Sequence, residues 1–230
     1  MYNKYVFINN NRKNKKEEIN KQENSQISFD MLENLNNEIG EEHLAKNISS
    51  NKRNKKGKNI TNFIDDYVLV DIETTGLSPI YDDIIEIGAI KVKNNQMIDS
   101  YNQLIKIDRN LPEMITELTG ITDEMLKTGK LPQIVLEEFV EFVKDDVIIG
   151  HNVNFDLGFL QNKCKKYLGY NLSNDYIDTL FLARRLVPNS INHKLGTLAK
   201  LFNISYEGAH RGLKDVEITY ELYNKLREIK

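Results

Sequence analysis

Three strand-like segments in a row, followed by an alternation of helical and strand-like segments, constrain the fold of this chain most strongly. The three segments, rich in β-branched and apolar residues, are 67–73, 84–93 and 97–107. The last two are joined by the tight turn Asn94-Asn95. An amphipathic helix is predicted at 132–144 and a short buried strand at 147–149. This order predicts an α/β domain whose mixed sheet is covered by helices.

The folded domain is predicted to span residues 63–230. Further helices are expected at 155–167, 178–187, 195–202 and 212–229. A loop is expected at 116–122, around Gly120.

The first 62 residues differ in composition from the rest. They contain 15 Asn and no Pro, and 12 Lys and Arg against 8 Asp and Glu give a charge of +4. A segment with so little apolar surface cannot offset its ordering entropy, so 1–62 is predicted to be a mostly disordered leader. A weak helical periodicity at 28–44 is one exception. The basic runs 12–16 and 52–58 either stay solvated or contact phosphates.

The residues after the leader are acidic, with 19 Lys and Arg against 26 Asp and Glu, a charge of −7. Bound cations would invert the local field, so this charge does not exclude a polyanionic substrate. No apolar run approaches the roughly 20 residues of a membrane span. The single cysteine, Cys164, excludes an internal disulfide, suits a reducing compartment and is expected to be an ordinary packed thiol. These features predict a cytoplasmic protein outside the membrane.

Asp71 and Glu73 lie two residues apart in a predicted strand, so their side chains project from the same face. Ile72, between them, is expected to point into the core on the other side. Ligand sites in α/β sheets usually lie at the carboxyl edge where this strand ends. Two adjacent carboxylates repel each other, and such hard oxygen ligands favour Mg²⁺ or Mn²⁺. Two exposed strand acids are the simpler alternative, which the following turn of Thr74 to Gly76 disfavours.

A second acid, Asp156, follows the strand at 147–149 and opens a helix. There it either stabilises the helix dipole or joins the site. Asn152 and Asn154 are candidate helix caps. His151 is expected to be a hydrogen-bonding loop residue rather than a catalyst.

A third segment contributes Asp215, in the first turns of the last helix, and His210 before it. Gly208 and Gly212 flank His210, which suggests a flexible loop. An imidazole with a pKa near ~6.5 suits a general base that takes a proton from water at neutral pH. Together these residue types predict attack of water on a phosphodiester, assisted by two ions roughly 3.5–4 Å apart. The chain has neither a Gly-rich phosphate loop nor a nucleophile elbow, which disfavours nucleotide-triphosphate hydrolysis and acyl transfer.

Three blocks of sequence resemble, in order, the catalytic blocks of the DnaQ-like DEDDh 3′–5′ exonucleases. The blocks are D-I-E-T-T-G (71–76), H-N-V-N-F-D (151–156) and H-R-G-L-K-D (210–215). The resemblance covers about residues 65–229, with supporting stretches at 77–93, 117–123 and 177–184. It is strongest to the proofreading exonuclease domain of PolC-type bacterial DNA polymerase III. It implies a ribonuclease H-like fold with a mixed five-stranded sheet flanked by helices.

The resemblance also implies roles for individual residues. The implied ligands of two Mg²⁺ or Mn²⁺ ions are Asp71, Glu73, Asp156 and Asp215. The implied catalytic residues are His210, as general base, and Glu73, which also approaches the terminal 3′-hydroxyl. The implied substrate-binding residues are Thr74, Thr75, Gly76, Leu77, Asn152 and Phe155, with Leu77 against the last base.

The predicted function is a metal-dependent 3′–5′ exonuclease that releases nucleoside monophosphates from single-stranded DNA 3′ ends, in replication proofreading or repair. No polymerase domain occurs in these 230 residues, so proofreading is expected to assist a replicative polymerase in trans. Residues 26–29 loosely resemble a sliding-clamp peptide, but the last position differs, and clamp binding is not expected. One alternative is an exoribonuclease similar to ribonuclease T or oligoribonuclease, because tolerance of a 2′-hydroxyl is not visible in the sequence. The other is a non-catalytic adaptor for nucleic acid or replisome proteins, which the intact blocks disfavour.

Overall fold

The computed structural model describes residues 57–229. Most of the predicted leader, including the helix expected at 28–44 and the clamp-like segment at 26–29, lies outside the described residues. The strands are β1 (Tyr67–Thr74), β2 (Ile84–Lys93), β3 (Gln96–Leu104), β4 (Ile148–Gly150) and β5 (Tyr176–Asp178). The helices are α2 (Glu113–Thr119), α3 (Asp123–Lys127), α4 (Pro132–Val143), α5 (Asn154–Leu168), α6 (Thr179–Leu186), α7 (Leu195–Leu201) and α8 (Gly212–Ile229).

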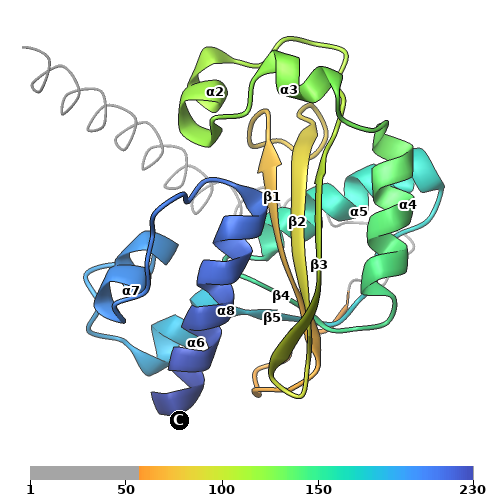
Figure 1. Ribbon diagram of the computed structural model, residues 1–230. Coiled ribbons are helices and arrows are strands. Elements are labelled where there is room, and N and C mark those ends of the chain that lie inside the picture. Colours follow the sequence, from red (N-terminus) through yellow and green to blue (C-terminus); the bar gives the residue numbers. More distant parts are fainter. Residues whose placement is uncertain (1–56, 230) are drawn as a thin grey trace, which may run out of the picture. The chain divides into compact units, whose positions relative to one another are not determined.

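The strands form one five-stranded mixed sheet in the order β3-β2-β1-β4-β5 (Figure 1). The neighbours of β2 run antiparallel to it, whereas β4 runs parallel to both β1 and β5. Asn94 and Asn95 join β2 to β3 with φ angles of 50° and 60°. A two-residue hairpin requires this left-handed conformation, which asparagine tolerates better than most residues. The expected mixed sheet is therefore confirmed.

Alternate residues of β1 build two separate cores, one on each face of the sheet. Val68, Val70 and Ile72 face the core that contains α4 and α5. Tyr67 and Leu69 face the other core, which contains α6, α7 and α8. Figure 1 shows these two groups of helices on opposite sides of the strands. Because helices cover both faces of the sheet, the candidate functional side chains are expected at the end of the strands.

The loop expected at 116–122 is wrong in its first half, because α2 occupies Glu113–Thr119. Ile115 is buried in a small cluster with Ile85 and Ile121, and this burial favours the helical turn. Gly120, with a φ of 68°, then ends the helix. The strand expected at 97–107 also ends earlier, at Leu104.

Chain pairing begins before the predicted domain boundary at residue 63. Ile60 N donates to Tyr176 O at 2.7 Å, and Tyr176 N donates to Lys58 O at 2.9 Å. Residues 58–60 thus run along β5, while the boundary itself stays a prediction. Within 57–229, no helix is both long and apolar enough to cross a membrane.

Candidate active site

Three carboxylates converge where β1 ends and α8 begins. Asp71 and Glu73 lie opposite Gly88 and Glu86 of β2, and therefore share one face. Asp215 approaches them from the first turn of α8. One carboxylate oxygen from each of Asp71, Glu73 and Asp215 lies within 4.8 Å of the other two.

The start of α8 reaches the sheet because two glycines meet there. A Cβ atom on Gly88 would lie 2.2 Å from the carbonyl carbon of Gly212. No larger residue fits this close approach without displacing the backbone. Gly212 is buried as the first residue of α8, so the flexible loop expected between Gly208 and Gly212 does not extend that far.

Glu86, which the sequence reasoning did not single out, fastens the same junction. Its side chain is 0% exposed and accepts from Arg211 Nη2 at 2.8 Å and Nε at 3.1 Å. It also accepts from Gly212 N at 3.0 Å. A charged residue inside the apolar strand sequence I-I-E-I-G was the available signal, because a buried carboxylate needs a partner. Arg211 is that partner, and it directly follows His210.

Asp156 lies beside the three-acid group without belonging to it. Its Oδ1 accepts from Ile72 N, at 3.1 Å, so its carboxylate sits next to the backbone between Asp71 and Glu73. The helix that carries it starts after Val153, with no side-chain cap. The expectation that Asn152 or Asn154 caps this helix is wrong. The backbone of Asn152 turns with a φ of 60°, and its N–H donates to Asp178 Oδ1, at the end of β5.

Burial and mutual repulsion make this group costly to ionise together. Burial, then the charge of Asp215, raises the pKa of Asp71 and of Glu73 well above the usual range. Burial raises the pKa of Asp156 to about 8 and that of Asp215 to about 6. Asp215 Oδ1 is buried and has no hydrogen-bond partner among the described residues. Several hard oxygen donors around an unpartnered buried oxygen fit divalent cations such as Mg²⁺ or Mn²⁺.

His210 is tied to the same acids through its backbone. Its φ is 66°, and its N–H donates to Asp215 Oδ2 at 2.8 Å. Its ring meets that of Tyr206 edge-on, with centroids 6.1 Å apart. Burial lowers the pKa of the His210 imidazole below its usual value, which favours the neutral, proton-accepting form at pH 7.

His151 has a different environment. Its Nδ1 lies 2.9 Å from Thr179 Oγ1 and its Nε2 lies 2.8 Å from the carbonyl oxygen of His193. Burial lowers its pKa to about 4. One ring nitrogen therefore contacts the first residue of α6 and the other contacts the loop before α7, which confirms the expected hydrogen-bonding role.

The loop after β1 is held rigid by polar contacts. Thr74 Oγ1 donates to Gly76 O at 2.6 Å, and a Cβ on Gly76 would lie 2.5 Å from the Asp82 carboxylate. Arg109 donates to Thr75 Oγ1, and its Nη2 lies 3.3 Å from Asp82 Oδ1. Arg109 and Asp82 were missed in the sequence, because surface charges give no periodic signal.

The remaining predicted substrate-binding residues lie on the two segments that flank the acids. Leu77 is half-buried in the loop after β1. Phe155 is half-buried in the first turn of α5, where its ring packs 4.9 Å from that of Phe159. Pro79, in the loop after β1, lies close to the next turn of α5, since a Cβ on Gly158 would meet its Cγ at 3.6 Å. The loop and α5 thus form two adjoining walls beside the acids.

Comparison with known proteins agrees with this arrangement. Residues 68–223 match the RNase T family model, described as Exonuclease. The chain is 44% identical over 161 residues, 70% of its length, to the PolC-type DNA polymerase III of Bacillus subtilis. It is 42% identical over 163 residues, 71% of its length, to that of Caldanaerobacter subterraneus. It spans 11% and 12% of the lengths of these two polymerases.

Two solved structures show the same fold. Exonuclease I of E. coli, in complex with a dT13 oligonucleotide, has a TM-score of 0.63 and 22% identity, covering 71% of this chain and 41% of that one. Exonuclease X, in complex with 5′ overhanging duplex DNA, has a TM-score of 0.56 and 23% identity, covering 70% and 91%. The ribonuclease H-like fold expected from the sequence is confirmed.

Proposed function

The chain belongs to the RNase T exonuclease family, and we propose that it removes nucleoside monophosphates from the 3′ ends of single-stranded DNA. The observation that carries the proposal is the convergence of Asp71, Glu73 and Asp215 around a buried, unpartnered carboxylate oxygen. The likeness to PolC-type polymerases supports a place in replication proofreading or repair, with a replicative polymerase as partner in trans.

Asp71, Glu73, Asp156 and Asp215 are the residues that would hold two Mg²⁺ or Mn²⁺ ions. Bound there, the ions supply charge neutralisation at the phosphodiester and acidify water. The raised pKa values of the four carboxyl groups favour this assignment, because a cation relieves the repulsion that raises them.

His210 is the proposed general base. The hydrogen bond from the His210 backbone N–H to Asp215 holds the backbone of His210 beside the acids. The lowered pKa of its imidazole keeps the ring neutral at pH 7, so that it can accept the proton of the attacking water. Glu73 is proposed to approach the terminal 3′-hydroxyl.

The two walls beside the acids are the proposed seat of the last nucleotide. Thr74, Thr75 and Gly76 offer backbone held in place by the Asp82 and Arg109 contacts. Leu77 offers an apolar surface to the last base. Asn152 and Phe155 support the other wall.

The test is the release of nucleoside monophosphates from 3′-ended single strands in the presence of Mg²⁺ or Mn²⁺. Asp71→Ala is expected to abolish release, and His210→Ala to slow it by about 10²–10⁴-fold. Asp99→Ala, which removes an exposed acid of β3, is the matched control and should leave the rate unchanged. Wild-type release no faster than that of Asp71→Ala would overturn the proposal.

Two alternatives are distinguished in the same assay. An exoribonuclease would prefer RNA over a DNA oligonucleotide of matched sequence, because its site accommodates the 2′-hydroxyl. A non-catalytic adaptor would bind both oligonucleotides and release nothing from either.

A further inference from the structure

A cavity of about 480 Å³ lies on the α4–α5 side of the sheet, outside the acid site. Its walls come from the segment after β3, the start of α4 and the second half of α5. Its cationic lining residues are Lys106, Arg109, Lys163 and Lys166, and its acidic ones are Asp83 and Asp108. The lining therefore carries 4 − 2 = +2 in a described domain that has 19 basic and 26 acidic residues, or −7.

Two of these cations hold the cavity together. Arg109 Nε lies 3.1 Å from Asp83 Oδ2, and Lys163 Nζ lies 3.4 Å from Asp83 Oδ1. The Lys163 side chain is only 4% exposed, so its ammonium group is fixed in the wall. Asp83 is thus shared between two cations.

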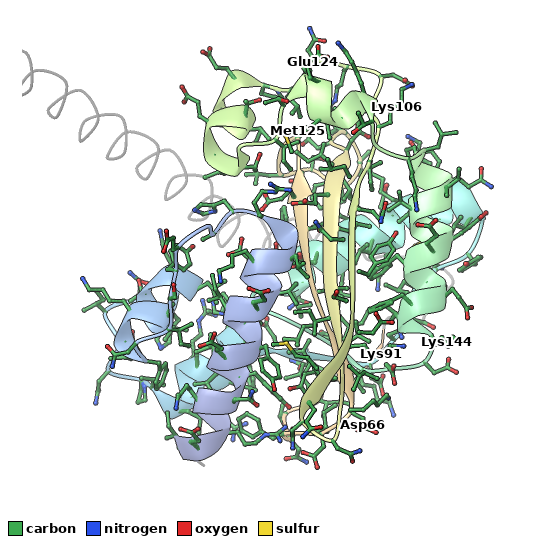
Figure 2. All side chains as sticks on the ribbon, in the orientation of Figure 1. Asp66, Lys91, Lys106, Glu124, Met125 and Lys144 are labelled. Carbon is green, nitrogen blue, oxygen red and sulfur yellow. The ribbon has the colours of Figure 1, made fainter. Side chains whose placement is uncertain are left out.

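Lys106 and Lys166 are the two cations left for a ligand. Both are exposed, and among residues 57–229 neither forms an ion pair. Figure 2 shows Lys106 at the end of the sheet where β3 finishes and α4 begins. Lys166 Nζ lies 4.7 Å from the ring centre of Tyr167, which also lines the cavity. Apolar side chains such as Leu131 and Ile107 complete the lining.

Cationic and apolar groups around one hollow match the chemistry of a single nucleic-acid strand. Such strands present phosphates to cationic grooves and bases to apolar or aromatic surfaces. An acidic peptide would satisfy the cations, and it would cover the apolar lining only where apolar residues accompany its acids.

The cavity is connected to the acid site along two elements. Thr75 N donates to Asp83 O at 2.9 Å, so the loop that follows the acids ends in the cavity wall. Helix α5 carries Asp156 in its first turn and Lys163 and Lys166 seven and ten residues later, which corresponds to about 10 and 15 Å along its axis. A stacked strand advances about 3.4 Å per nucleotide. Lys166 therefore lies about four nucleotides from the acids.

We propose that this cavity binds the backbone of the same single strand through Lys106 and Lys166, with Lys166 at about the fourth nucleotide from the 3′ end. The inference rests on the proposed function, since it assumes that the acids hold the terminal nucleotide. Substrates long enough to reach the cavity gain phosphate contacts that a dinucleotide lacks.

The test compares Lys106→Ala/Lys166→Ala with the wild type on a dinucleotide and on a ten-nucleotide strand with the same 3′ end. The double variant is expected to lower kcat/KM for the long strand about tenfold and to leave the dinucleotide unchanged. Binding is measured in the background of Asp71→Ala, which is expected to abolish cleavage. There the slope of log K against log salt concentration should become less steep by about 1.4, or about 0.7 for each lost phosphate contact. Lys106→Arg/Lys166→Arg should retain both properties.

The matched control is Lys165→Ala/Lys200→Ala, which removes two exposed lysines outside the cavity, one of them next to Lys166 on α5. It should behave as the wild type. Equal losses in the control, or equal losses on both substrate lengths, would overturn the proposal. Unchanged binding of the long strand in Lys106→Ala/Lys166→Ala would also overturn it and leave the cavity to another partner, such as an acidic peptide. If the wild type cleaved neither substrate, the proposed function would fail, whereas these binding measurements would still report on the cavity.

Discussion

Replacing Arg211 with methionine is expected to destabilise the protein because it leaves the buried carboxylate of Glu86 without its charged partner. The carboxylate is 0% exposed and accepts from two guanidinium nitrogens, at 2.8 and 3.1 Å. Methionine preserves most of the aliphatic stem but offers no donor. The carboxylate would keep only its contacts to Gly212 N, at 3.0 Å, and Asn102 Nδ2, at 3.3 Å.

The size of the expected loss in unfolding free energy depends on how deeply each partner of the pair is buried. Removing one partner of a fully buried pair costs about 3–5 kcal/mol. The Arg211 side chain is 39% exposed, so water replaces part of what the carboxylate loses, and about 2–3 kcal/mol is expected. Adding Glu86→Gln removes the charge while leaving an oxygen to accept from Gly212 N. The double variant should therefore lie within about 1 kcal/mol of the wild type.

Urea unfolding in EDTA measures these differences in the free energy of unfolding, provided that all variants show the same m-value. Lys225→Met is the matched control, since it breaks an exposed pair with Glu228 on the same helix, α8, and should cost about 0.5 kcal/mol or less. An Arg211→Met cost no larger than that of this control, or a failure of Glu86→Gln to restore stability to Arg211→Met, would show that the unpaired Glu86 charge is not the cause.

Three further outcomes are expected. Mg²⁺ or Mn²⁺ should raise the melting temperature of the wild type by relieving the repulsion among the acids; an equal rise in Asp71→Asn/Asp215→Asn would place the stabilising ions elsewhere. In EDTA, the free energy of unfolding should fall as pH rises from about 6.5 to about 8, because the raised pKa of Asp156, about 8, keeps this carboxyl group protonated in the folded state while the unfolded chain is ionised. Below about pH 6.5 the lowered pKa of His151 acts in the opposite direction. Urea titrations from about pH 6.5 to about 8 that show rising stability would contradict this expectation. Gly88→Ala should push the start of α8 off the sheet, which lowers the free energy of unfolding by about 1–3 kcal/mol and reduces nuclease activity. Gly158→Ala meets only an ordinary 3.6 Å contact inside a helix and should be neutral or stabilising. Thermal melts and rate measurements on both variants test this contrast.

The strands β1 and β2 were predictable because their apolar residues are both numerous and periodic. The three-residue strand β5 and the seven-residue helix α2 were not located, because segments this short gain their stability from burial against distant residues such as Ile85. The alternation of Asp71 and Glu73 on one face followed directly from strand geometry.

The contacts that orient the candidate site were much less visible in the sequence. The pairing of Glu86 with Arg211 spans 125 positions, and the contact by which Arg109 holds the loop after β1 spans 34 positions. The expected capping by Asn152 failed because its backbone adopts a positive φ and its N–H donates to Asp178, at the end of β5, instead. Local signals therefore identified the acids, whereas the groups that position them required the folded chain.

The four acids come from three segments that lie far apart in the chain, and this has a practical consequence. Between α6 and α7 the chain runs through Ile191, whose side chain is 92% exposed. A cut there leaves Asp71, Glu73 and Asp156 on one fragment and Asp215 with His210 on the other. Neither fragment alone carries the complete set, and the two rejoin only when α8 docks again on the sheet. The chain thus has the layout of a split nuclease, in which recovered cleavage would itself report that the two halves have met.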